Sequence, residues 1–172
     1  MKRFLTLALA LTMLLAGCST EVAEYRQQQP RLDIFQYFQG KTEAWGMVQD
    51  RSGKQIRRFH VEIAGDVIGD TLTLNEHFVY DDGEKQQRVW HIRRVGNDRY
   101  EGTAGDIDGV ATGQAAGNAF NWHYSMNVKA NGSTWRLTFD DWMYLQDETH
   151  LFNKTEMKKF GVTVATVTLF FT

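Results

Sequence analysis

The sequence predicts an all-β protein, an antiparallel up-and-down meander of about ten strands that closes into a barrel, preceded by a short helix. Apolar and polar residues alternate with a period of two from residue 42 onward, which is typical of strands with one buried face. Almost every gap is a turn signal, such as Asp82-Gly83 or Asn131-Gly132. No helical crossover separates the strands, and closure removes exposed edges. A two-sheet sandwich is the alternative.

The first element is the N-terminal segment, which has the pattern of a bacterial lipoprotein signal. Lys2 and Arg3 precede the apolar run Phe4 to Leu15, which is too short to span a bilayer, and Ala16-Gly17 lead into Cys18. We therefore expect residues 1–17 to be a signal peptide cleaved before a lipidated Cys18. An ordinary secretory signal with a chance cysteine is the alternative.

Cys18 also determines the expected location. A lipidated cysteine carries several acyl chains, which together anchor a protein stably to a membrane. Ser19 stands where an Asp would indicate retention in the inner membrane, so we expect the outer membrane, facing the periplasm. Cys18 is the only cysteine, which excludes an internal disulfide. Residues 18–29 lack an apolar pattern and are expected to be a lipidated tether.

Residues 30–172 form the expected single barrel domain. Leu32, Ile34, Phe35 and Phe38 are spaced for about two turns of helix, with Pro30 near the start. The predicted strands are 42–50, 55–64, 69–80, 86–95, 99–105, 109–116, 119–130, 133–145, 149–158 and 161–171.

The turns set the register of the hairpins, because the apolar faces must match. A three-residue loop at 81–83 places Glu76 opposite Arg88 on the apolar side. The Gly117-Asn118 turn pairs small residues with large rings, and the Asn131-Gly132 turn places Asp141 opposite Trp122. Aromatic residues on this inward face line a cavity for an acyl chain or fill the interior; they are Trp90, Trp122, Tyr124, Trp135 and Phe139.

Polar residues on the inward face are the candidate ligand contacts. Arg88 is expected to hold a ligand carboxylate or polar head group as a bidentate donor, with Glu76 orienting it. The alternative is a self-satisfied interior ion pair. Asp141 is a candidate polar anchor; otherwise it caps turn amides or bonds Trp142 Nε1 or Lys154. The expected ligand-binding set is Glu76, Arg88, Trp90, Trp122, Tyr124 and Asp141.

Several classes of function lack the residues they need. The formal charge is −2, with 19 basic and 21 acidic residues spread along the chain, so nucleic acid is not an expected partner. The five histidines fall on polar strand faces without metal-ligand spacing. Neither a Gly-x-Ser-x-Gly elbow nor a nucleotide-binding glycine loop is present. We expect no metal, no cofactor and no catalytic residue.

The sequence resembles a family of uncharacterised proteobacterial lipoproteins, catalogued as a domain of unknown function, over essentially the whole mature domain. That resemblance implies a location and a fold, with no mechanism. The helix, Gly40 and Trp45 ahead of a meander are also similar to the lipocalin and calycin arrangement, although this glycine and tryptophan lie further apart than in lipocalins. The family motifs are Phe38-Gln39-Gly40 to Trp45-Gly46, Leu74–Phe78, Tyr80–Gly83, Arg88–Trp90, Gly117–Ala119, Asp140–Met143, Asn153-Lys154 and Lys159–Gly161.

Three functions follow from these observations. The first is a non-enzymatic, lipocalin-like lipoprotein that binds a hydrophobic or acyl ligand, such as a fatty acid or lipid, at the outer membrane. The second is an envelope interaction or structural lipoprotein whose barrel is filled by its own side chains. The third is a lipid-modifying enzyme that uses Glu76, Arg88 and Asp141. A contiguous interior cavity favours the first over the second.

Overall fold

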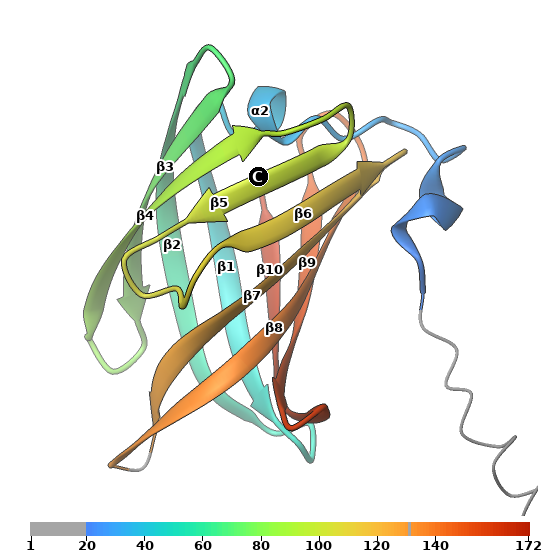
Figure 1. The fold of residues 1–172 in the computed structure, drawn as a ribbon. Coiled ribbons are helices and arrows are strands. Elements are labelled where there is room, and N and C mark those ends of the chain that lie inside the picture. Colours follow the sequence, from blue (N-terminus) through green and yellow to red (C-terminus); the bar gives the residue numbers. More distant parts are fainter. Residues whose placement is uncertain (1–19, 131) are drawn as a thin grey trace, which may run out of the picture.

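The ten strands form one closed antiparallel barrel in which each strand pairs with its neighbours in sequence and β1 also pairs with β10 (Figure 1). The computed structural model describes residues 20–130 and 132–172, so the expected signal peptide and Cys18 lie outside it. The predicted all-β meander is therefore confirmed, and the sandwich is excluded. No helix in the described part of the chain has the length and apolar character needed to cross a membrane.

The strands begin and end close to the predicted positions. The largest difference is in β2, whose ladder with β3 continues to Ile68 instead of ending at residue 64. The strands are β1 (Gly40–Asp50), β2 (Gln55–Ile68), β3 (Thr71–Tyr80), β4 (Lys85–Arg94), β5 (Arg99–Thr103), β6 (Ala111–Ala116), β7 (Ala119–Ala130), β8 (Ser133–Leu145), β9 (Leu151–Lys159) and β10 (Val162–Phe171).

The N-terminal helix is shorter than predicted. The α2 helix (Ile34–Tyr37) has a single turn, and it starts after Asp33, whose side chain accepts a hydrogen bond from the Phe35 amide as an N-cap. Residues before Asp33 cannot continue this helix because the Leu32 amide donates to the carbonyl of Gly117. The α2 turn lies across one end of the barrel (Figure 1).

Part of the expected tether packs against the barrel. Residues Val22–Tyr25 form the short 3-10 turn η2, in which the Val22 side chain is buried in a cluster with Ala119. The Tyr25 ring lies 5.4 Å from the ring of Tyr144. The chain is thus held against the outer face of the barrel at Val22 and Tyr25.

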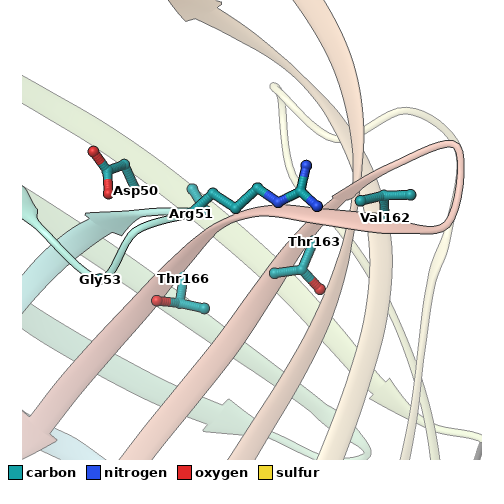
Figure 2. Close-up of a pocket in the computed structure, with 7 residues that line it drawn as sticks. Asp50, Arg51, Gly53, Val162, Thr163 and Thr166 are labelled. Atoms are coloured by element: carbon teal, nitrogen blue, oxygen red, sulfur yellow. The ribbon is translucent and has the colours of Figure 1, made fainter.

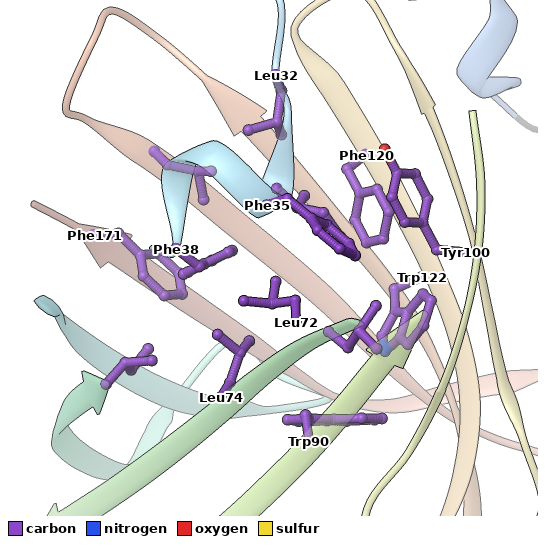
Figure 3. Close-up of a cluster of buried hydrophobic side chains, with 14 of the residues drawn as sticks. Leu32, Phe35, Phe38, Leu72, Leu74, Trp90, Tyr100, Phe120, Trp122 and Phe171 are labelled. Atoms are coloured by element: carbon purple, nitrogen blue, oxygen red, sulfur yellow. The ribbon is translucent and has the colours of Figure 1, made fainter. Parts of the chain in front are cut away.

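The end of the barrel under α2 is filled with side chains, and we call it the closed half. Gly113 faces Trp122 in the ladder, and a Cβ at position 113 would lie 2.2 Å from that ring, so the predicted pairing of small residues with large rings is confirmed. Figure 3 shows this core, whose labelled members are Leu32, Phe35, Phe38, Leu72, Leu74, Trp90, Tyr100, Phe120, Trp122 and Phe171.

The other half of the barrel, which we call the open half, is less densely filled. Strand alternation directs Val48, Phe59, Phe78, Met126 and Val167 inward, yet all five are only half-buried. Because these side chains point into the barrel, their exposed surface faces its interior. The open half also contains the buried side chains of Leu137, Phe139 and Met157, against which Met126 and Val167 pack. It is therefore only partly filled, and we call the solvent-accessible space left between its inward side chains the hollow.

Candidate functional site

Charged and polar side chains form a layer between the closed and open halves, which we call the polar belt. On β3 and β7 the belt residues lie two positions beyond the closed-half core, since Glu76 follows Leu74 and Tyr124 follows Trp122. The belt comprises Glu76, Arg88, Asp106, Tyr124, Asp141 and Asn153.

Arg88 is bound mainly by a residue that the sequence did not single out. Its Nε and Nη2 atoms donate to the carboxylate of Asp106 at 2.8 to 3.1 Å, while Nη1 lies 3.7 Å from Oε2 of Glu76. Burial alone lowers the pKa of Arg88, but the carboxylates of Glu76 and Asp106 outweigh it and raise that pKa above its usual value. The predicted face-to-face placement of Glu76 and Arg88 is confirmed, but the bidentate face of Arg88 is already occupied.

Glu76 is a buried acid without a hydrogen-bond donor. Its Oε2 atom is buried and has no hydrogen-bond partner. Burial raises the pKa of Glu76 to about 7, against the attraction of Arg88, and the nearby Asp106 and Asp141 raise it further. Glu76 therefore exchanges its proton near neutral pH, unlike an exposed glutamate.

Asp141 faces inward, as predicted, and is held by hydrogen bonds. Tyr124 donates its hydroxyl proton to Oδ2 at 3.4 Å, and the Asn153 amide donates to Oδ1. Burial raises the pKa of Asp141 to about 6, although the hydrogen bonds of Asn153 and Tyr124 lower it. Burial also raises the pKa of Tyr124 well above its usual value, so its hydroxyl stays protonated. The expected bonds to Trp142 Nε1 or Lys154 are not among those of Asp141.

Trp90 and Trp122 lie in the closed half, directly next to the belt. Both are buried, and their rings meet edge to face at 5.7 Å. Trp90 also contacts Tyr124 at 5.5 Å between ring centroids. These two tryptophans thus fill the barrel and form the floor of the open half. Of the other aromatic residues predicted to face inward, Tyr124 and Phe139 stack at 4.8 Å in the open half, whereas Trp135 is 47% exposed and does not fill the interior.

A loop between β5 and β6 closes the wall of the barrel beside the belt. Both strands are short, so the loop 104–110 spans the gap that they leave between β4 and β7. Ile107 forms a single antiparallel β-bridge with Met126 on β7. The Asp108 carboxylate forms an ion pair with Nε of Arg136 on β8, at 2.6 Å. Together with the hydrogen bonds that Arg88 donates to Asp106, these contacts hold the loop over the gap.

Two surface pockets lie near the open half, and neither is lined by the five half-buried inward side chains of that half. One of about 340 Å³ lies beside the loop on the outer face of the barrel, between Asp108 and the outward-facing His123, Ser125 and Thr138. The other, of about 440 Å³, lies at the rim between Arg51 in the β1–β2 turn and Thr163 and Thr166 of β10 (Figure 2). Their sizes fall within the range of about 300 to 1,000 Å³ that is typical of ligand sites. Among the described residues, no group of histidine, aspartate or glutamate side chains could hold a metal ion.

Comparisons with known proteins extend the description of the fold. A solved structure described as the S-type phycobiliprotein lyase CpeS from Guillardia theta matches with a TM-score of 0.57 and 8% identity, over 80% of this chain and 87% of that chain. At this identity the likeness shows the fold alone. No curated protein matches the sequence. The model of the family described as "Protein of unknown function (DUF3833)" matches residues 12–172, and the chain belongs to that family.

Proposed function

We propose that this protein is a lipocalin-like binding lipoprotein that holds a hydrophobic or acyl ligand in the open half of its barrel, without catalysis. The observation that carries the proposal is the accessible apolar wall. Val48, Phe59, Phe78 and Met126 point inward and are only half-buried, in a molecule whose other half is fully packed. A protein with a purely structural barrel gains stability by filling such a hollow.

The energetics favour an elongated apolar ligand. Each Å² of apolar surface removed from water contributes about 25 cal/mol, so a chain lying against these side chains gains several kcal/mol. The polar belt at the inner end of the hollow supplies a place for a polar head group. An apolar pocket with a few convergent polar groups is the usual form of a small-molecule site.

The location is part of the same proposal. The lipobox at residues 15–18 supports lipidation of Cys18 and attachment to the outer membrane on its periplasmic side. Such an anchor keeps the barrel beside lipid, which is a source of amphiphilic ligands.

Native mass spectrometry tests the binding function directly. The chain from Thr20 onward contains the whole closed barrel and its core, and we expect it to purify with an apolar adduct. Val167→Trp places a large side chain in the hollow and is expected to abolish the adduct, whereas Thr168→Trp, on the opposite face of β10, leaves it. A chain that carries no adduct from any growth condition and binds no apolar dye would contradict the proposal.

A second candidate is catalysis on a lipid at the same belt. The observation that favours it is Glu76, a buried carboxyl group with a pKa of about 7 beside Arg88, because general acids and bases work best near the operating pH. The test is turnover of long-chain ester substrates by the wild type and by Glu76→Gln. Unchanged turnover in Glu76→Gln would exclude a role for Glu76.

A further inference from the structure

The polar belt carries more acidic than basic groups. Three carboxyl groups, those of Glu76, Asp106 and Asp141, face a single guanidinium group, that of Arg88. Asp106 already takes two nitrogen atoms of Arg88. The belt therefore has an excess of negative charge when its acids are ionised, and its one cation is already paired.

The hydrogen-bonding state of these carboxyl groups shows which one lacks a partner. Asp141 accepts bonds from Tyr124 and Asn153, and Asp106 accepts them from Arg88. Only Oε2 of Glu76, among the belt carboxylates, is buried without a donor. A buried acceptor left unpaired destabilises the protein, so a donor that reaches the Glu76 carboxylate after a rotation of its side chain recovers that free energy.

The surroundings of Glu76 suit a positive group. Phe78 follows Glu76 on the inward face of β3, and its ring contacts that of Phe59 at 5.7 Å, so the wall next to the carboxyl group is aromatic. Aromatic faces attract cations, and the guanidinium of Arg88 already lies 5.5 Å from the Phe78 ring. A carboxylate head group would instead meet the excess of acidic groups and find only Nη1 of Arg88 free to donate.

We propose that the polar belt binds the amine head group of an amphiphile, whose ammonium donates to the carboxylate of Glu76 while its alkyl chain fills the open half. This inference rests on the proposed binding function and names its ligand class. With the ammonium in place, three carboxylates face two cations, and every belt carboxylate has a donor. The expected preference is for amines over fatty acids of the same chain length.

Competition among three probes of equal chain length tests this preference. Dodecylamine, dodecanoic acid and dodecanol are titrated, below their micelle concentrations, against a neutral apolar dye bound to the chain from Thr20 onward. At about pH 8, above the pKa of Glu76, we expect dodecylamine to bind at least about tenfold more tightly than dodecanoic acid. Glu76→Gln should weaken dodecylamine about tenfold and leave dodecanol unchanged.

The control is Glu62→Gln, which changes an exposed acid on the outer face of β2 and should alter none of the three affinities. Dodecanoic acid binding as tightly as dodecylamine to the wild type would overturn the inference while leaving the binding function intact. An undiminished amine preference in Glu76→Gln would overturn it as well. If none of the three probes displaces the dye, the proposed binding function itself fails. The wild-type comparison decides the question even if Glu76→Gln does not fold.

Discussion

Glu76 combines two properties that rarely occur together in a side chain selected for stability alone. Its carboxyl group is buried beside a cation, yet the cation binds another acid more closely, at 2.8 Å against 3.7 Å. Removing the Glu76 carboxylate from water costs more free energy than its attraction to the distant guanidinium recovers. The neutral form of the carboxyl group is therefore favoured, and its pKa rises. Glu76 therefore lowers the stability of the empty protein at high pH, which is common at sites that bind a ligand.

The first prediction concerns the stability of Glu76→Gln as a function of pH. The pKa of Glu76 is about 7 in the folded chain and 4.5 when unperturbed, so the folded state binds more protons between these values and loses stability as the pH rises through them. This loss amounts to about 3 kcal/mol. Glutamine carries no charge, so the variant should equal the wild type near pH 4 and exceed it by up to this amount near pH 8.

Urea denaturation at several pH values measures this difference. Asp141 also contributes a loss of stability between its ordinary pKa of 3.8 and about 6, and because it does so in both proteins, most of this contribution cancels in the difference. Glu62→Gln serves as the exposed control and should show no pH-dependent difference. Equal stability of Glu76→Gln and the wild type near pH 8 would mean that the carboxyl group is better solvated than the structure indicates.

The second prediction concerns the coupling of Arg88 to Glu76. The positive charge of Arg88 lowers the pKa of Glu76 against the larger effect of burial. Replacing Arg88 with Met keeps most of the side-chain volume and removes the charge, so the pKa of Glu76 should rise further above 7. Carbon-13 NMR of the Glu76 carboxyl group follows the titration directly. A pKa that falls in Arg88→Met would show that Arg88 raises the pKa of Glu76 by burying it more than it lowers that pKa by its charge.

Strand alternation predicted some belt residues and not others. Two turns were enough to place Glu76 opposite Arg88 and Asp141 opposite Trp122, because register follows from turn length once one face must be apolar. Asp106 could not be found in this way, because it lies in a loop whose path no ladder determines. Asn153 had a usable signal: it alternates with Leu151 on β9 and so had to face inward.

At the level of elements, the barrel wall depends on glycines that let large rings approach the backbone. Gly113 on β6 lies under the Trp122 ring of β7, and Gly102 on β5 lies under the same ring, where an added Cβ would be 2.7 Å from the nearest ring carbon. The alternation of small and large residues was readable from the sequence. The length of α2 was not, because its start is set by the Asp33 cap and by a backbone bond to Gly117 across the barrel.

The third prediction therefore concerns Gly113→Ala. The added methyl group would lie 2.2 Å from the Trp122 ring and must displace it. Overpacking of this kind typically costs about 1 to 3 kcal/mol, which thermal or urea unfolding detects. Thr112→Ala, at the adjacent exposed position on the same strand, is the matched control and should cost much less. A Gly113→Ala protein as stable as its control would show that the Trp122 ring has room to move.

At the level of the whole molecule, the attachment of the chain and the mouth of the hollow lie at opposite ends. The η2 turn packs against β6 and β7 near the end that carries α2, whereas the β9–β10 hairpin lies at the far end (Figure 1). Three residues lie between Cys18 and Val22, so the four residue steps reach about 14 Å at most. Strand β8, with 13 residues, extends about 40 Å. If Cys18 is lipidated, the mouth of the hollow should therefore face away from the anchoring membrane.

The fourth prediction tests this orientation with fluorophores placed at two sites. Cys18 is the only cysteine, and its sulfur carries the lipid in the proposed mature protein, so Thr20→Cys or Phe160→Cys adds a single reactive thiol. Phe160 is 93% exposed at the tip of the β9–β10 hairpin, and its φ of 51° is unfavourable for phenylalanine, so its replacement should not harm the fold.

In vesicles with a nitroxide-labelled lipid, the fluorophore at position 20 should be strongly quenched and the one at position 160 little affected, because quenching requires contact with the bilayer. Strong quenching at position 160 would contradict this orientation, because it would place the mouth of the hollow at the membrane. The barrel would then either lie on its side or open directly toward the bilayer.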